Sequence, residues 1–240
     1  MQPAPGFVSP PVTGRSINLV LVLMVIAAIF PTLAIAGEWL YWQRHTGEGY
    51  VSSASEWTTQ SGTASAAAPG TGDVLVIRGP GTMRIDASHV PSGIIDQMWV
   101  GDATPPDEWP FAPIPAGTGN VIQTSGTVQY SSWFIIGRNG APGESTYDMQ
   151  GGSLMQVGGG QPFVIGNNWS PTRPTSGLLT MSTDASIINN HMFVVGDHVG
   201  ATGTLRMRDS SRIDTSEFDV GWYEGVGVAT LSGSASLTSR

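Results

Sequence analysis

The residues best suited to chemistry are arginines, acids and a tryptophan gathered between positions 206 and 222. A guanidinium on the outer side of a strand can hold the carboxylate of an acidic sugar through two parallel hydrogen bonds, and an indole ring can stack on the sugar. The candidate carbohydrate-binding residues are Arg206, Arg208, Asp209, Arg212, Asp214 and Trp222, with Glu217 and Asp219 nearby in the sequence. A solvated outer face with balanced charges is the simpler interpretation of the same residues, and we favour it.

A second candidate is a metal site formed by His191, Asp197 and His198. Histidine is the commonest metal ligand. His191 precedes an apolar run whereas His198 follows the glycine that closes it, and no third histidine is close in the sequence. An ordinary surface pair is therefore the favoured interpretation, and the sequence predicts no metal ion, no cofactor and no catalytic residue.

The remaining motifs indicate surface loops. Asn168-Trp169-Ser170 has the form of a glycosylation acceptor, which the following proline places in a loop. Aromatic residues that could stack on sugars, or fold back over the protein, are Trp109, Trp169, Trp222 and Tyr223. The glycines at 158–160 lack the lysine and helix of a phosphate-binding loop.

Composition excludes several classes of protein. Only 12% of the 240 residues are charged, about half of the ~25% that is usual. All 10 basic residues are arginines, and the net charge of -8 argues against nucleic acid as a partner. With 32 glycines, 17 prolines and no cysteine, a helical bundle and a disulfide-stapled domain are both excluded.

The first 36 residues have the pattern of an export signal. An apolar stretch from Ile17 ends in Ala34-Ile35-Ala36, the small-x-small arrangement that signal peptidase accepts. We expect cleavage before Gly37; an uncleaved membrane anchor is the alternative, because about 20 apolar residues can span a bilayer. Either way, the sequence predicts a secreted or cell-surface protein.

The rest of the chain repeats a short tag made of an aromatic residue or methionine, aliphatic residues and a glycine. Five glycines close the tags, Gly101, Gly137, Gly166, Gly196 and Gly221, spaced by 36, 29, 30 and 25 residues. Four of the tags begin with phenylalanine, Phe134, Phe163, Phe193 and Phe218. Recurrence at a near-constant period is typical of stacked repeats, so we expect these residues to form internal ladders.

Alternation within the repeats indicates strands. In Thr204-Leu205-Arg206-Met207-Arg208 every second side chain is apolar, as one buried strand face requires. A second tag places two apolar residues six positions apart around a small-residue corner, as in Met181 and Ile187. The sequence thus predicts an all-β parallel β-solenoid of about five coils over 73–240, which we expect to continue in a longer chain. Residues 37–72, with three tryptophans, are predicted to be an N-terminal cap or linker, and a jelly roll or sandwich is the alternative fold.

Four stretches carry a family resemblance. The run from Gly143 to Leu154, followed by Phe163-Val164-Ile165-Gly166-Asn167, resembles the strand repeats of autotransporter passengers and of secreted PEP-CTERM-type proteins of Gram-negative bacteria and planctomycetes. The stretches 55–58 and 68–73 resemble the element that precedes such repeats. The resemblance implies a right-handed parallel β-helix displayed at or beyond the cell surface, and it transfers no catalytic residues.

These observations favour a structural or adhesive surface protein without catalysis of its own. A polysaccharide-binding or polysaccharide-degrading β-helix protein is the alternative. The expected partners are a cell-surface or extracellular polysaccharide and a second copy meeting an open coil end. An enzyme would gather acidic side chains from adjacent coils into one groove, whereas a scaffold would scatter them.

Overall fold

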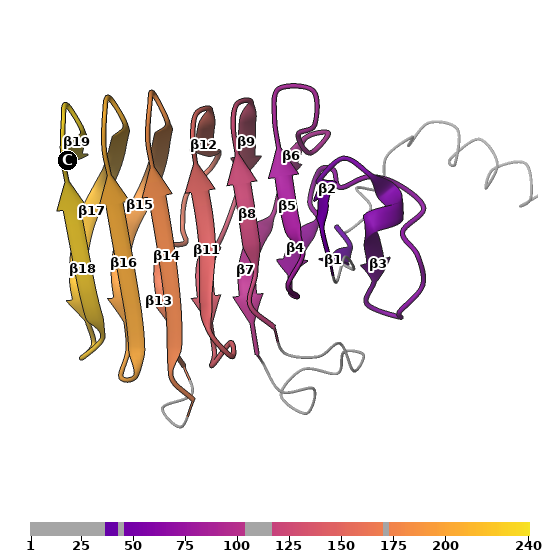
Figure 1. Cartoon of the computed structure of the whole chain (residues 1–240), viewed down its shortest axis with the longest axis horizontal. Helices are drawn as coiled ribbons and strands as arrows, with labels where there is room; N and C mark the ends of the chain where they lie inside the picture. The colour runs from indigo at the N-terminus through magenta and orange to yellow at the C-terminus, as the bar shows by residue number, and fades with distance from the viewer. Residues whose placement is uncertain (1–36, 43–45, 104–116, 170–172) are drawn as a thin grey trace, which may run out of the picture. The chain divides into compact units, whose positions relative to one another are not determined.

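The computed structural model describes residues 37–42, 46–103, 117–169 and 173–240, and the predicted signal segment lies outside these residues. The described part is all-β apart from one short 3-10 helix, η1 (Ala54–Glu56). No helix among the described residues is long and apolar enough to cross a membrane. Two sheets make up the structure, and with one exception their strands run parallel (Figure 1).

One sheet contains seven parallel strands stacked in chain order. They are β2 (Glu48–Tyr50), β5 (Thr82–Ile85), β8 (Asn120–Gln123), β11 (Glu144–Met149), β14 (Thr175–Met181), β16 (Ala201–Met207) and β18 (Val226–Leu231). Each strand pairs in register with the next, and we call one such level of the stack a rung. Cα partners on successive rungs include Met149, Met181 and Met207. Outward positions alternate with these inward ones along each strand.

The second sheet has twelve strands arranged in two rows. One row contains β1 (Trp39–Trp42), β4 (Val74–Ile77), β7 (Gln97–Asp102), β10 (Phe134–Arg138) and β13 (Phe163–Asn167), with β3 (Trp57–Thr59) at its edge. The other contains β6 (Ile94–Ile95), β9 (Thr127–Tyr130), β12 (Ser153–Gln156) and β19 (Ser236–Ser239). The long strand β15 (Ser186–Asp197) joins the rows, because it pairs with β12 in one row and with β13 in the other. The long strand β17 (Arg212–Trp222) pairs with β15, with a register shift between Asn189 and Met192, and with β19.

This topology confirms the predicted β-solenoid-like stacking and excludes the jelly roll. The chain passes from the seven-stranded sheet through both rows of the other sheet and returns one rung further on. Parallel neighbours such as β14 and β16 are therefore about 25 residues apart in sequence yet adjacent in space (Figure 1). Antiparallel hairpins, which a sandwich requires, do not connect the stacked strands.

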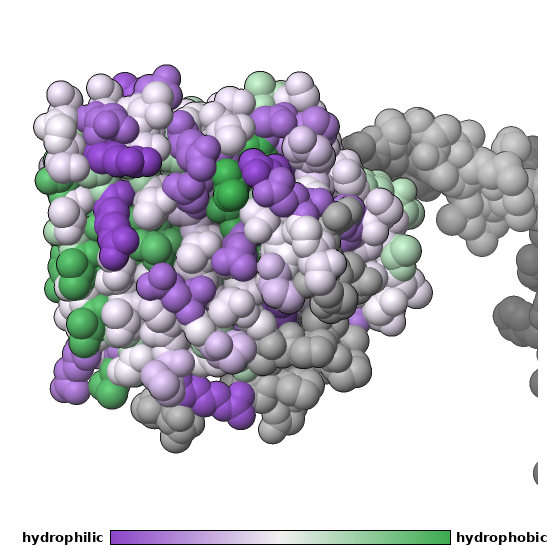
Figure 2. All heavy atoms as spheres, in the orientation of Figure 1, coloured by the Kyte–Doolittle hydropathy of each residue, from purple (hydrophilic) through white to green (hydrophobic). Residues whose placement is uncertain are grey.

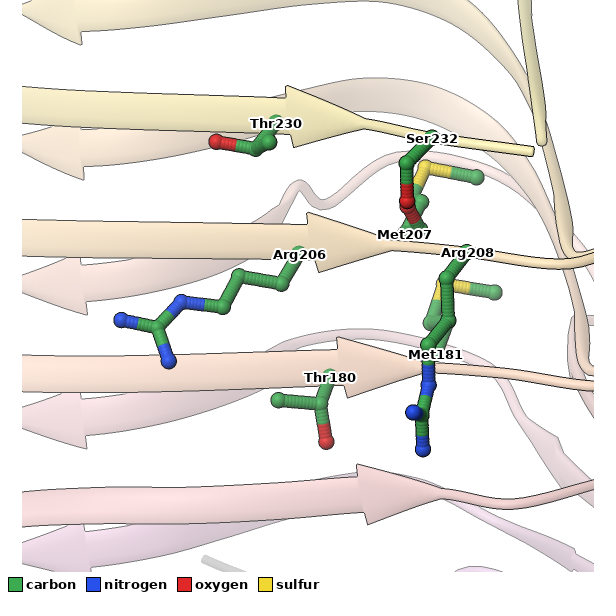
Figure 3. A pocket seen from close by; sticks show the side chains of 7 residues that line it. All are labelled: Thr180, Met181, Arg206, Met207, Arg208, Thr230 and Ser232. Carbon is green, nitrogen blue, oxygen red and sulfur yellow. The ribbon is translucent and has the colours of Figure 1, made fainter.

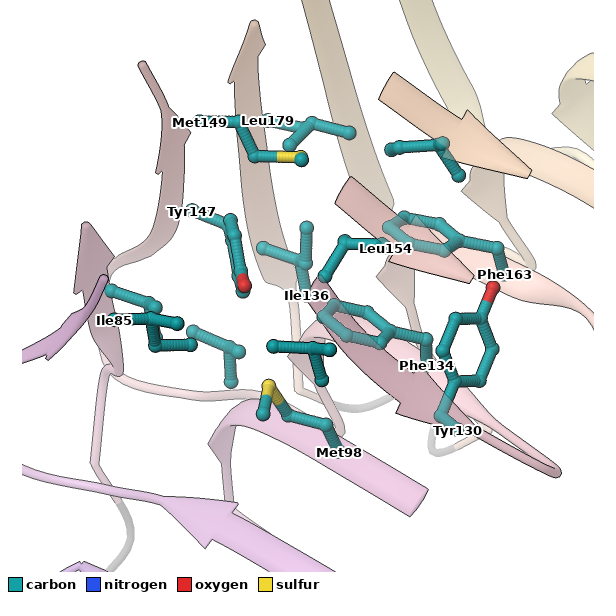
Figure 4. Close-up of a cluster of buried hydrophobic side chains, with 14 of the residues drawn as sticks. Ile85, Met98, Tyr130, Phe134, Ile136, Tyr147, Met149, Leu154, Phe163 and Leu179 are labelled. Carbon is teal, nitrogen blue, oxygen red and sulfur yellow. The ribbon is translucent and has the colours of Figure 1, made fainter. Parts of the chain in front are cut away.

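The aromatic ladder fills the core. Phe134, Phe163, Phe193 and Phe218 are Cα partners on four successive rungs. The first three rings stack nearly parallel, with centroids 4.6 Å apart at both steps, and the last step is 5.8 Å. Figure 4 shows the Phe134 and Phe163 rings one above the other beside Tyr130. Removing these rings from water stabilises the stack by about 1.5–3 kcal/mol for each fully buried side chain.

Glycines bring the two sheets into close contact. Gly196 has a φ of +80°, and a Cβ there would lie 2.2 Å from the carbonyl oxygen of Val226 on the next rung. Gly203 has an ordinary φ, yet its Cβ would lie 2.2 Å from the carbonyl oxygen of Ile165. Equivalent positions on other rungs are also glycine: Gly101, Gly137, Gly166 and Gly221 in the first set, Gly177 and Gly227 in the second. Only a residue without a side chain allows this approach.

The N-terminal segment is integrated into the sheets rather than separate from them. Within residues 37–72, β1 pairs in parallel with β4 and β2 pairs in parallel with β5, so regular stacking begins before residue 73. The capping element is β3, which pairs antiparallel with β1. Trp42 of β1 and Trp57 of β3 meet edge to face at 5.3 Å, and the Trp57 indole N–H donates to the Val51 carbonyl. These rings close the core at that end.

At the other end, β18 and β19 each have a strand neighbour on one side within the described residues. The stretch 225–239 carries no charged residue. Val226, Val228 and Leu231 are exposed there, and Figure 2 shows hydrophobic surface along this edge at the left of the view. Proteins usually protect such strand edges with charges or a covering element, and this edge has neither in the described part.

Candidate functional site

The first candidate site is a shallow groove on the outer face of the seven-stranded sheet. Its cavity volume is about 360 Å³, and it is lined by Thr180, Met181, Arg206, Met207, Arg208, Thr230 and Ser232. Strand register places Arg206 between Thr180 and Thr230 on adjacent rungs. Figure 3 shows the Arg208 side chain extending from β16 toward β14 beside Met181, whereas Arg206 runs along its strand with its guanidinium turned toward Thr180.

Strand alternation explains this arrangement. Leu205 and Met207 point into the core, so Arg206 and Arg208 must point outward. No acidic side chain of the described residues forms an ion pair with Arg206. The Arg208 Nε lies 3.9 Å from an Asp209 carboxylate oxygen, and both side chains are more than half exposed. The groove is therefore a local site of positive charge on an acidic protein, able to attract an anion.

The predicted charged cluster divides between two faces. Arg206, Arg208 and Asp209 remain together, and the Asp209 carboxylate accepts a hydrogen bond from the Thr183 N–H across the corner. Arg212 and Asp214 lie on β17 in the other sheet, where Asp214 forms an ion pair with Arg240. The structure therefore brings Arg206, Arg208 and Asp209 together and places Arg212 and Asp214 on the other sheet, because the chain turns a corner at 208–211.

Trp222 lies at a different corner, where β17 ends and the chain returns to the seven-stranded sheet. Its Cα partner on the preceding rung is Asp197, which is paired in turn with Asn167 on β13. The ring of Trp222 lies 4.2 Å from that of Tyr223 and 6.3 Å from that of His198. This corner therefore gathers aromatic rings from two successive rungs.

Asp197 is the buried acid of that corner. Its side chain is 3% exposed, the Asn167 side-chain amide donates to it at 2.6 Å, and the His198 Nδ1 lies 2.5 Å from its other oxygen. Burial raises the pKa of the Asp197 carboxyl, and the neighbouring imidazole and amide oppose that rise. His191 lies in β15, before the core-facing Phe193, and no group of three metal-binding side chains is found in the described part of the chain.

The Asn168 amide is not displayed for glycosylation. Asn168 is buried, and its side-chain N–H donates to the Val199 carbonyl at 2.8 Å. Trp169 is 48% exposed, with its ring 5.6 Å from that of Trp133. Ser170 and Trp109, two residues of the predicted loop motifs, lie outside the described residues.

Sequence reasoning missed a buried row of polar residues that follow the tag glycines. Asp102, Arg138, Asn167 and Asp197 are Cα partners on successive rungs and are all buried. Asp102 forms ion pairs with Arg78 and with Arg138, the latter at 3.1 Å, and the Arg138 guanidinium lies 3.9 Å from the Trp99 ring centroid. The signal was present, since a polar residue follows the glycine in each of these four tags.

Two outer acids, Asp148 on β11 and Asp214 on β17, are dispersed over the two sheets. Asp148 has Ile122 and Thr180 as rung neighbours, and Asp214 has Ile188 and Thr238. The rungs on either side therefore place no second carboxylate beside Asp148 or Asp214 at these paired positions. Hydrolysis of a glycosidic bond commonly needs two such groups facing each other across the substrate.

Comparisons with known proteins found no similarity: no family model, no curated protein and no solved structure matches the chain.

Proposed function

We propose that this chain is an exported β-solenoid with a structural or adhesive role at the cell surface and no catalysis of its own. The observation that carries the proposal is the ladder of Phe134, Phe163, Phe193 and Phe218, which runs through parallel rungs stacked in register. Such a core makes a stiff column from which the corner loops project. The dispersed outer carboxylates support a scaffold over a glycosidase.

The finer features of this proposal are a right-handed column of about five coils, a cleaved segment 1–36 and kinship with autotransporter passengers or PEP-CTERM-type proteins. Right-handed winding is supported by the strong general preference for right-handed parallel crossovers. Export is supported by the apolar stretch that ends in Ala34-Ile35-Ala36. The uncharged edge of β18 favours association with a second copy at that end.

The test uses the full chain expressed in a Gram-negative host. We expect N-terminal sequencing of the exported protein to begin at Gly37, and protease added to intact cells to remove it. Incubation with pectate, alginate and xylan should release no reducing ends. A protein retained in the cytoplasm would contradict the proposed location, and released sugar would contradict the absence of catalysis.

A second candidate function is binding of an acidic polysaccharide in the arginine groove. The unpaired guanidinium of Arg206, beside Arg208, favours it. We expect the Arg206→Ala/Arg208→Ala variant to lose salt-sensitive binding to pectate. Arg84 offers a matched control, because it lies on the same sheet but is already held by both carboxylate oxygens of Glu48. If Arg84→Ala weakens binding as much, the groove is not the site.

A further inference from the structure

The corner at the end of β17 has the composition of a sugar-binding platform. We propose that His198, Trp222 and Tyr223 form a binding site for a neutral pyranose sugar. The site lies in the loops that return from β15 and β17 to the seven-stranded sheet, whereas Arg208 lies in the loop that leaves it. These loops are at opposite ends of the strands in Figure 1, so the site is separate from the arginine groove.

Three rings from two rungs meet at this corner with their planes inclined by 36° to 75°, so a sugar would stack on a single ring, that of the exposed Tyr223. The Trp222 and Tyr223 centroids are 4.2 Å apart, and the Tyr223 ring lies 5.0 Å from the His198 imidazole. Tyr223 is 60% exposed, and the other two side chains are partly exposed. A pyranose with equatorial substituents presents a flat face of axial C–H groups, which suits an exposed aromatic surface.

Two of the three aromatic residues of this corner have a left-handed backbone. His198 and Tyr223 have φ values of +73° and +44°, in the left-handed region that bulky residues rarely adopt, and Glu224 follows at +65°. At the equivalent position after β10 the residue is Asn139, a type that tolerates this conformation. Corners elsewhere in the repeat place Thr183 and Asp209 in the same region, so what distinguishes this corner is that bulky rings occupy it.

Buried polar groups orient the imidazole. The Asp197 carboxylate lies 2.5 Å from His198 Nδ1, so Nε2 is the ring nitrogen left to contact a ligand. Asn167 in turn donates to Asp197 and holds the carboxylate in place. A sugar hydroxyl lying on the rings would find hydrogen-bonding groups in His198 Nε2 and the Tyr223 hydroxyl.

The charges of the corner favour a neutral ligand over an ion. Its acids are Asp197 and Glu224, which disfavour an anion. The Asp197 carboxylate is buried against Asn167 and His198, so it is not presented to an incoming ammonium group. A polyhydroxylated neutral ring is the ligand class that matches both the aromatic surface and the single-point hydrogen-bonding groups.

The test titrates the full chain with cellohexaose, mannohexaose and maltohexaose by calorimetry and by tryptophan fluorescence. We expect at least one to bind, and Trp222→Ala and Tyr223→Gly to weaken that binding at least about tenfold. Tyr223→Gly removes the ring but suits the left-handed backbone, so its melting temperature should be no lower than that of the wild type. This variant separates loss of the platform from loss of the fold.

Tyr50→Ala is the matched control. Tyr50 is also exposed and stacks on a histidine, His89, at 3.9 Å, but it lies on β2. Sugar binding should survive in this variant and in Arg206→Ala/Arg208→Ala. The two proposals are therefore tested separately: if the arginine groove does not bind pectate, sugar binding at the corner can still be measured. The inference is overturned if none of the three sugars binds, if Tyr223→Gly binds like the wild type, or if Tyr50→Ala loses binding equally. Tighter binding of tetramethylammonium than of any sugar would also overturn it.

Discussion

Replacing Phe193 with alanine should remove the centre of the aromatic ladder. The Phe193 ring is fully buried, stacks on Phe163 at 4.6 Å with the planes 7° apart, and faces Phe218 at 5.8 Å on the next rung. The alanine side chain cannot reach either neighbour. Parallel strands fix the rung spacing on both sides, so the surrounding rungs cannot collapse into the space that is left.

The expected loss of stability follows from burial and cavity formation together. Truncation of a buried phenylalanine to alanine typically costs about 3 to 5 kcal/mol. At roughly 2–4 °C per kcal/mol for a domain of this size, the melting temperature should fall by about 6 to 20 °C. Phe193→Leu, which keeps most of the volume, should cost less than about 1.5 kcal/mol.

Thermal and urea unfolding, followed by circular dichroism, measure these changes. Phe218→Ala is the matched control, because Phe218 is half-buried and stacks on one phenylalanine; its loss should cost about 1 to 2 kcal/mol. If Phe193→Ala and Phe218→Ala were equally mild, the stacked core would be refuted. An unchanged melt for Phe193→Ala would mean that its side chain faces solvent.

Three further predictions concern glycine packing and buried ionisable groups. Gly203→Ala should strongly destabilise or unfold the protein in a urea titration. Gly159→Ala is the control and should leave stability unchanged, because no atom lies within 4 Å of its added Cβ. Equal effects of the two substitutions would contradict the close contact of the sheets. Burial raises the pKa of Asp197 above 3.8, so the folded protein holds this proton more tightly than the unfolded chain does. As pH rises from 3.8 through the higher folded pKa, the free energy of unfolding of the wild type should therefore fall relative to that of Asp197→Asn. A relative increase over that pH range would contradict the raised pKa. Burial also raises the pKa values of Tyr130 and Tyr147, so stability should fall above pH 10.0 and their phenolates should form only on unfolding; absorbance showing both ionised in the folded protein would disprove their burial.

The repeat could be predicted from the sequence because its signals are local. Alternation around Leu205 and Met207 identifies a strand with one buried face, and recurrence of the tag at Phe163 and Phe193 identifies the rungs that stack. Both depend on side-chain type and spacing alone. The inward and outward sides of most strands follow from the same rule.

The candidate site could be predicted only in part, because corners and burial depend on distant residues. The sequence places Arg206 and Arg212 six residues apart, but the corner between them puts the two side chains on different sheets. The positions of His191 and His198 around the apolar run favour an ordinary surface pair, yet Asp197 is buried. Its burial arises from Asn167 on the preceding rung and from the His198 corner, contacts that no local pattern encodes.

Spin labels on the seven-stranded sheet test the stacked, in-register rungs most directly. The chain has no cysteine, so pairs of introduced cysteines would be labelled uniquely. Register aligns Thr82, Asn120, Thr146, Leu178, Thr204 and Val228 along one outer row. Labels at Val228 and Asn120 should lie about 19 Å apart, and labels at Val228 and Thr82 about 24 Å, at ~4.8 Å per rung. Pulsed dipolar distances that did not grow by one rung spacing from the first pair to the second would contradict the fold and the scaffold proposed from it.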